Sequence, residues 1–297
     1  MKSSFQAINS PYNSFIRQES EMFYQASLLL EEDKHILSWA LFALWKGLTP
    51  FESWQDEVSS QTFLRKLKKT FLFQDAFDDT LTVPDNAWMD LHEAFTPYDH
   101  ELLLKLYNGL EASSGTIRFP TFVDLDFYLR CVGASVALVS AHILFHHEMQ
   151  SGNCEFVECV NKLGMGVLWW SLLKETHLLV QEGRLFIPLE DLVSFNCSEE
   201  DLLNARNSKE MKDLTKYELE RVVQLLRINK KNNSSYPKGL KEVLCFISNQ
   251  LTDQVHSALH SGWTLADVNP PDKKPIKKSW FINGITHLQR NSNKVQG

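Results

Sequence analysis

The sequence predicts an all-α fold in which helices pack as a single domain. Apolar residues recur with helical periodicity along most of the 297-residue chain, whereas strand-like alternation is scarce. Two long segments, near residues 122–148 and 154–181, are hydrophobic on nearly all sides, as central helices are. No linker interrupts residues 19–262. We therefore expect one domain over 19–262, with a flexible leader (1–18) before it and a polar, basic tail (263–297) after it.

The first half of the domain contains five expected helices. Phe23, Ala26 and Leu30 share one face of the first helix. Asp33 is a suitable N-cap for the second, and the Pro-Tyr-Asp sequence at 97–99 is a start signal for the fifth. These helices are expected at residues 20–30, 36–45, 61–72, 86–94 and 99–111.

The second half contains the two long apolar helices and three more. The later three are expected at residues 199–205, 209–226 and 237–261. A polar loop at 229–235 separates the last two. From residue 269 onward the run PPDKKPIKK and an Asn/Gln-rich end are typical of a flexible tail.

Composition narrows the classes of function. A net charge of −7 disfavours broad nucleic-acid binding, which needs a basic face. Five cysteines without metal-ligand spacing indicate reduced thiols in a cytoplasmic protein. The longest apolar run, Val132–Phe145, is shorter than the roughly 20 residues that span a bilayer. We expect a soluble cytoplasmic protein with no transmembrane segment; peripheral membrane contact and organelle import stay open as alternatives.

Five segments, in order, resemble the squalene/phytoene synthase family. The strongest match is GRLFIPLEDL (183–192), which is similar to the family's Gly-Arg-x-Tyr-x-Pro signature and is followed by SEEDLL (198–203). Weaker matches are FYQAS (23–27), the stretch from DKH to ALFAL (33–44), and residues 109–132. The resemblance covers about residues 20–260. It implies the isoprenoid synthase fold, an all-α bundle around a central cavity.

The family condenses two prenyl diphosphates head to head, and its aspartate-rich motifs hold Mg²⁺. Carboxylates four residues apart on a helix share those ions, which neutralise the leaving diphosphate. The first motif falls on TPFESW (49–54), where aspartates are missing and Pro50 opposes a helix. A shifted pair, Glu52 and Asp56, is the alternative.

The second motif falls on LWWSLLKETHLL (168–179). Its one carboxylate is Glu175, and the partner position is Leu179. The family's glutamine and asparagine positions are Leu168 and Ser171, and an acidic position after Gly109 is Ser113. The resemblance therefore implies a scaffold that has lost most of its metal ligands, with Mg²⁺ as cofactor only if activity persists.

The basic positions of these motifs are kept. Arg118, Lys174 and Arg184 are the candidates for diphosphate binding, because a guanidinium can hold a phosphate without a metal. The alternative is that they form structural ion pairs. Tyr128, Trp169 and Trp170 are the candidates for lining a prenyl cavity, with ordinary core packing as their alternative.

Two histidines have the spacing of a metal-binding helix. His142 and His146 share a helix face, and Glu175 or His177 on the following helix is the nearest choice of third ligand. The alternative is that these histidines are solvated or interact with the helix C-terminus. No glycine-rich phosphate loop, Gly-x-Ser-x-Gly sequence or Cys-x-x-Cys pair occurs.

These observations favour a catalytically silent relative of the family that binds an isoprenoid lipid, a prenyl diphosphate or a protein partner. The resemblance supplies a precedent, since a degenerate mitochondrial branch of the family is implicated in assembly of respiratory complex I. The alternative is an active prenyltransferase with a reorganised diphosphate site. A third hypothesis is a new metal-dependent activity at the histidine pair.

Overall fold

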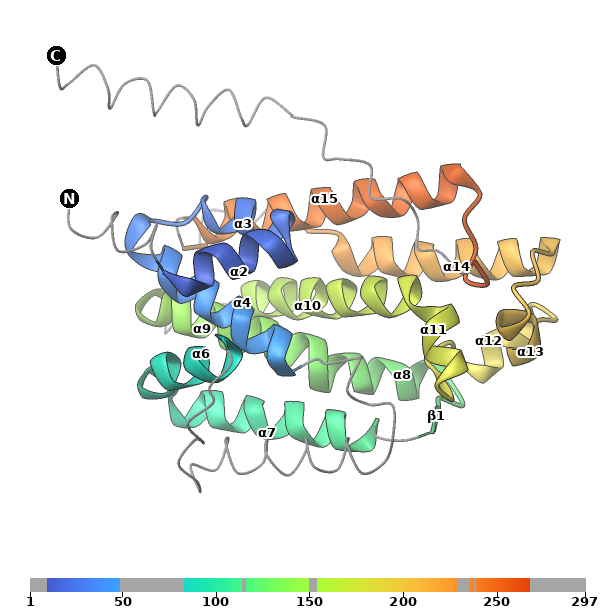
Figure 1. Cartoon of the computed structure of the whole chain (residues 1–297), viewed down its shortest axis with the longest axis horizontal. Helices are drawn as coiled ribbons and strands as arrows, with labels where there is room; N and C mark the ends of the chain where they lie inside the picture. The colour runs from blue at the N-terminus through green and yellow to red at the C-terminus, as the bar shows by residue number, and fades with distance from the viewer. Residues whose placement is uncertain are drawn as a thin grey trace, which may run out of the picture.

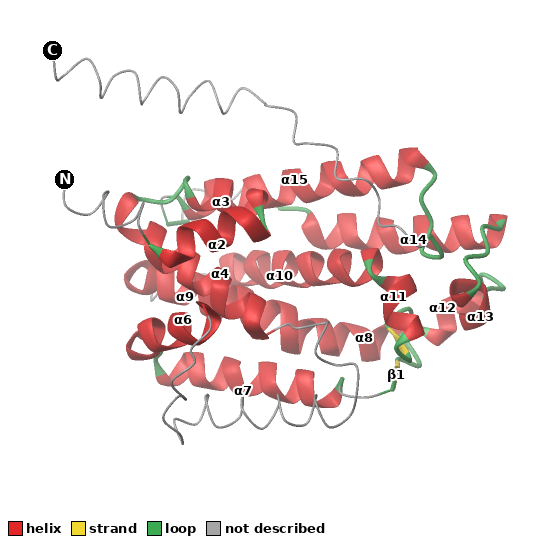
Figure 2. Cartoon of the chain, viewed as in Figure 1, coloured by secondary structure: helices red, strands yellow, loops and turns green. Residues whose placement is uncertain are grey.

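The computed structural model describes residues 10–48, 83–113, 116–149, 154–228, 236–237 and 239–267. These residues are almost all helical, with one short strand pair (Figures 1 and 2). The helices are α2 (Pro11–Glu19), α3 (Glu21–Ser27), η1 (Glu32–Lys34), α4 (His35–Leu48), α6 (Val83–Leu91), η3 (His92–Ala94), α7 (Pro97–Ala112), α8 (Phe122–Leu129), η4 (Arg130–Ala134), α9 (Ser135–Met149), α10 (Cys154–Lys174), α11 (Thr176–Gln181), α12 (Leu189–Ser194), α13 (Glu199–Leu203), α14 (Lys209–Leu226) and α15 (Leu240–Ser261). The strands are β1 (Ile117–Arg118) and β2 (Arg184–Leu185).

The long helices lie side by side in a bundle. α10 packs against α9, α14 and α15, and α7 covers the other side of α9. Figure 1 shows the strand pair, α12 and α13 gathered at one end of this bundle. The all-α fold predicted from the sequence is confirmed, and the predicted helices at 36–45, 99–111, 209–226 and 237–261 correspond to α4, α7, α14 and α15.

The centre of the bundle is a crossing of two backbones without intervening side chains. η4 is a π-helix turn between α8 and α9, and it carries Gly133. A Cβ added at Gly133 would lie 2.6 Å from the carbonyl oxygen of Gly164 on α10, and one added at Gly164 would lie 2.3 Å from that of Gly133. Only glycine at both positions allows this approach.

The second long helix is interrupted where the sequence predicted continuity. α10 ends at Lys174, and Glu175 has φ −99° and ψ 7°, outside the helical region. α11 then begins at Thr176. The predicted helix over 154–181 is therefore two helices, and Glu175 lies at the break between them.

Both predicted ends of the domain differ from the structure. Residues 11–18 of the expected leader belong to α2, which Ser10 caps and Pro11 begins, and which buries Tyr12 and Ile16. Beyond residue 262, Leu265 donates its backbone N–H to Thr215 Oγ1 (3.1 Å) and is buried. The apolar side chains of these two short segments are buried only because the segments pack against other parts of the chain.

Several predicted features lie outside the described residues. These are the helix expected at 61–72, the first-motif residues 49–54 with the alternative pair Glu52 and Asp56, and the tail from 268 onward. Within the described chain, one stretch, Phe122–Phe145, is long and apolar enough to cross a membrane, but 56% of its most apolar window is buried in the bundle. A core helix has the same properties.

Candidate functional site

The Gly-Arg-x-Phe-x-Pro segment is held in place by the strand pair. Gly183 has φ +76°, which a glycine adopts without strain, and it turns the chain out of α11 into β2. β2 pairs in parallel with β1, with Ile117 opposite Arg184 and Arg118 opposite Leu185. Because successive side chains of a strand point to opposite faces, Arg118 and Arg184 project in opposite directions. The strand pairing therefore places these two basic candidates on opposite faces of the strand pair.

The Arg118 guanidinium is surrounded by hydrogen-bond acceptors of neighbouring residues. Its Nε donates to Glu199 Oε2 at 2.9 Å, and its Nη2 donates to the other oxygen of the same carboxylate. Its Nη1 donates to the carbonyl oxygens of Ile117 (2.6 Å) and Gly183. This bidentate pair joins β1 to the start of α13, which is the structural ion pair that the sequence offered as the alternative to phosphate binding.

We expect the Arg118–Glu199 pair to contribute to stability rather than to anion binding. In a double-mutant cycle with Arg118→Ala and Glu199→Ala, chemical denaturation should give a coupling free energy of about 1 kcal/mol, because both side chains are partly exposed. Each single variant should bind prenyl diphosphate as the wild type does. A large loss of binding in Arg118→Ala with no loss in Glu199→Ala would contradict this role.

Arg184 lies inside the fold. Its side chain is 2% exposed, and burial lowers the pKa of its guanidinium below the ordinary value. The guanidinium carbon is 5.3 Å from the ring centroid of Phe186, which packs against Phe119 and Tyr128 at 5.7 and 5.4 Å. Burial also raises the pKa of the Tyr128 phenol, while nearby Arg184 acts to lower it. Arg184 and Tyr128 therefore belong to one buried cation–aromatic cluster.

Lys174 and Glu175 lie together at the α10–α11 break. Both are half-buried, and the Lys174 Nζ is 5.4 Å from the centroid of the Trp170 ring. Among the described residues, no hydrogen bond or ion pair engages the Glu175 carboxylate. The partner position, Leu179, is 3% exposed and part of the core. In this part of the chain, the second motif offers one carboxylate and an apolar side chain instead of two carboxylates.

The two tryptophans of the second motif are buried in the bundle. Trp169 is 0% exposed and Trp170 is 1% exposed. Trp170 donates its Nε1–H to Gln254 Oε1 on α15 (3.1 Å) and packs edge-on against Trp263, with ring centroids 6.0 Å apart. Through these contacts Trp170 joins α10 to α15, and it packs as a core residue does.

His142 and His177, two of the candidate metal ligands, have other partners in the structure. His142 Nδ1 contacts the buried Asp99 carboxylate at 2.8 Å, and that carboxylate also caps α7 through Thr96. His177 contacts the carbonyl oxygen of Leu202 at 3.1 Å and the side chain of Gln181. The His146 side chain lies outside the described part of the structure. Among the described side chains, no group of three or more His, Cys, Asp or Glu could hold a metal ion.

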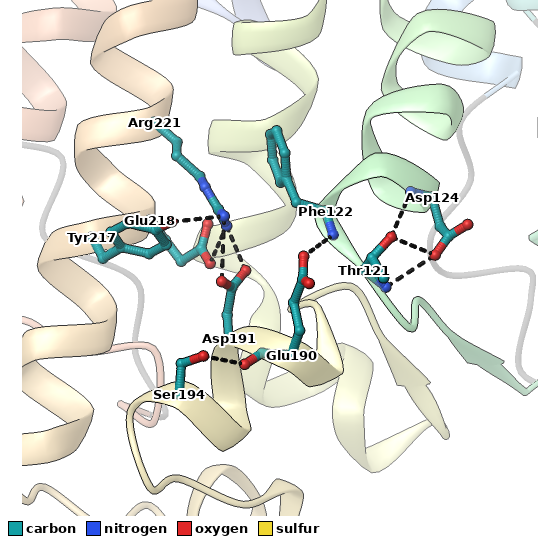
Figure 3. A network of polar contacts seen from close by, with 9 residues as sticks. All are labelled: Thr121, Phe122, Asp124, Glu190, Asp191, Ser194, Tyr217, Glu218 and Arg221. Carbon is teal, nitrogen blue, oxygen red and sulfur yellow. Dashed lines mark hydrogen bonds and ion pairs between the residues drawn. The ribbon is translucent and has the colours of Figure 1, made fainter.

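A polar network that the sequence patterns did not predict joins α8, α12 and α14 (Figure 3). At its centre, Arg221 on α14 bonds Asp191 on α12 and Glu218 on its own helix. Glu190 Oε1 accepts from the backbone N–H of Phe122 at 2.6 Å, which ties α12 to α8. The signal for this network was Glu218, a charged residue in register with the apolar face of α14 that contains Leu214.

Comparison with known proteins places the fold. A family model described as squalene/phytoene synthase matches residues 16–261. A dehydrosqualene synthase crystal structure with bound ligand superposes with a TM-score of 0.73 at 15% identity, covering 99% of this chain and 98% of that one. The squalene synthase from Alicyclobacillus acidocaldarius gives a TM-score of 0.63 at 17% identity, covering 84% and 92%.

Two relatives with similar sequences are phytoene synthases. The 15-cis-phytoene synthase of Synechocystis sp. is 28% identical over 220 residues, which cover 69% of this chain and 62% of that relative. The phytoene synthase of Arthrospira platensis is 25% identical over 215 residues, covering 69% and 68%. The chain thus spans less than two thirds of the Synechocystis enzyme. The family match over nearly all of the described helices means that this chain belongs to the squalene/phytoene synthase family.

Proposed function

We propose that this chain no longer condenses prenyl diphosphates with Mg²⁺ and acts as a non-catalytic isoprenoid-binding or protein-assembly factor. The observation that supports this proposal is the second motif, where Glu175 lies at a helix break and Leu179 is buried in the core. A divalent ion that bridges this motif to a diphosphate would have one carboxylate ligand from the motif.

Charge neutralisation determines how much the loss of these metal ligands costs. Ionising a prenyl diphosphate leaves negative charge on the diphosphate, and hard cations held by carboxylates neutralise it. Each lost ligand should raise the barrier by several kcal/mol, and each 1.4 kcal/mol lowers the rate about tenfold. The side chain at position 179 cannot substitute, because leucine offers no oxygen. Turnover through this motif should therefore be negligible.

Ligand binding without turnover is compatible with the basic residues at the same place. Lys174 is adjacent to Glu175 and half-buried, so it is the basic candidate that we assign to a diphosphate. Arg118 is held by Glu199 and Arg184 is buried among aromatic rings, and we assign both to the stability of the fold.

We also propose a cytoplasmic location. In the described chain Cys131, Cys159, Cys197 and Cys245 are all free thiols, which is typical of proteins in a reducing compartment.

The alternative function is an active prenyltransferase with a reorganised site. It is favoured by one observation, the half-buried Glu175 carboxylate that no described side chain engages. Such an enzyme would combine Glu175 with carboxylates from the region of Glu52 and Asp56, and Mg²⁺ would be its cofactor.

The test is incubation of the purified protein with labelled farnesyl and geranylgeranyl diphosphates and Mg²⁺, with diphosphate release and prenyl products measured. We expect release no higher than in a heat-killed control, while calorimetry on the same protein detects farnesyl diphosphate binding. Glu175→Gln should leave this basal level unchanged. The matched control is Glu158→Gln on α10, the helix that ends just before Glu175, where Glu158 forms a surface pair with Lys162 (3.0 Å).

The active-enzyme alternative predicts the opposite result. Release that a chelator abolishes, and that Glu175→Gln removes while Glu158→Gln retains, would establish the active-enzyme alternative and overturn the proposal. Absence of both release and binding would leave protein assembly as the function to pursue, by purification of complexes formed with the full chain.

A further inference from the structure

Two carboxylates from different helices share one guanidinium at the edge of the bundle. Arg221 Nη1 donates to Asp191 Oδ2 and, at 2.9 Å, to Glu218 Oε1, while its Nη2 donates to Asp191 Oδ1 at 3.3 Å. The guanidinium carbon lies 4.0 Å from the ring centroid of Phe122 and 4.3 Å from that of Tyr217. Figure 3 shows Asp191 reaching this guanidinium from α12, with Glu190 beside it.

Glu218 is the unusual member of this cluster. It is 0% exposed, and its second oxygen, Oε2, is buried without a hydrogen-bond partner. With both carboxylates ionised, the cluster would carry a net negative charge away from water and an unsatisfied anionic oxygen. Either feature costs free energy in a buried site. A proton on Glu218 removes the excess charge and leaves Arg221 neutralised by Asp191.

We propose that the Asp191–Glu218–Arg221 cluster is a pH-sensitive latch, which holds α12 and the preceding residues 183–188 against α14 while Glu218 is protonated and releases them more readily once it ionises. The connection to residues 183–188 is direct. Leu189 donates its N–H to the carbonyl of Phe119 (2.9 Å), and Glu190 bonds the start of α8, so α12 anchors this segment at its C-terminal end.

The surroundings of Glu218 support this assignment. Burial raises its pKa to about 8; Asp191 also raises it, and Arg221 acts in the opposite direction. In the described chain, Asp191 and Arg221 are the ionisable groups that shift the pKa of Glu218. Tyr217 on α14 bonds Arg221, α8 contributes the Phe122 ring, and α10 carries Lys174, whose Nζ lies over Trp170.

The direction of the pH effect follows from linkage. Between the ordinary glutamate pKa of about 4.3 and the folded value of about 8, the latched state binds one more proton than the released state. The latch is therefore tightest at low pH. Its opening constant should rise by up to about tenfold per pH unit through this window and level off above it.

The test is hydrogen–deuterium exchange of the amides in residues 184–195 at pH 6 and pH 8, corrected for intrinsic exchange. In the wild type, the opening constant should rise at least tenfold more than in Glu218→Gln, which keeps the shape but cannot ionise. The control is Glu220→Gln, an exposed neighbour on α14 whose carboxylate is 3.9 Å from Lys216. It should respond to pH as the wild type does.

Equal pH responses in wild type and Glu218→Gln would overturn the latch. If Glu218→Gln does not fold, Asp191→Asn provides the second test. Removing that negative charge should move the wild-type transition to lower pH, and an unmoved transition would also overturn the proposal. The readout needs no ligand, so its outcome is independent of the proposed function.

Discussion

Gly164→Ala should destabilise the protein by about 3 kcal/mol, the upper end of the usual range for overpacking a core. The added methyl would lie 2.3 Å from the carbonyl oxygen of Gly133 and 2.6 Å from the Cβ of Ala137. The first neighbour is backbone, so relief requires moving η4 away from α10. Chemical denaturation monitored by circular dichroism measures the change, and Gly133→Ala should behave alike, because its Cβ would meet the Gly164 carbonyl at 2.6 Å.

Gly166→Ala is the matched control on the same helix. Its added methyl would meet mainly the side chain of Leu226, with the nearest atom at 2.9 Å, and a leucine end can shift. Both substitutions gain about 1 kcal/mol of helix propensity. Gly166→Ala should therefore be much less damaging. Equal destabilisation by the two variants would mean that the backbone contact between Gly133 and Gly164 is not the limiting one.

Trp169→Ala should cost about 3–5 kcal/mol of stability, as is usual for truncation of a buried large aromatic residue. Trp169 is 0% exposed, and the lost side chain would leave a cavity in the centre of the bundle. Thermal unfolding should show a large fall in midpoint. Phe127→Ala on α8 is the control, because its 67% exposed ring contributes little to the core, and its stability should stay within about 0.5 kcal/mol of wild type.

This variant also separates the two interpretations of Trp169. As a core residue, it should change stability strongly, whereas a residue lining a prenyl cavity would change farnesyl diphosphate affinity at nearly constant stability. Calorimetric titration of the folded fraction supplies the affinity. A stable Trp169→Ala protein with altered affinity would assign Trp169 to the cavity instead of the core.

Local patterns were sufficient for most of the helices. The apolar register of residues 209–226 predicted α14 with the observed bounds, and the Thr96–Asp99 capping box begins α7 where a start signal was expected. The break at Glu175 was not predictable in this way. Apolar residues continue through it, and periodicity alone does not register a single residue that leaves the helical region.

The residues that pair in the candidate site lie far apart along the chain, so the sequence did not reveal these pairs. The sequence showed Arg118, Lys174 and Arg184 at basic positions, but not that Arg118 bonds Glu199, which is 81 residues away. Nor did it show that pairing of β1 with β2 turns Arg118 and Arg184 to opposite faces. α2 was also missed, although Ser10 and Pro11 are a usable start signal.

The sequence by itself determined the helical class, the family and the absence of most carboxylates from the two motifs, because these depend on residue identity and local spacing. Only the tertiary structure decided which charged groups are neutralised by one another and which are buried. Asp191 meets Arg221 across 30 residues of chain, and Glu218 is 0% exposed in the folded chain. Burial and charge pairing arise from contacts between distant segments, so they are properties of the folded chain.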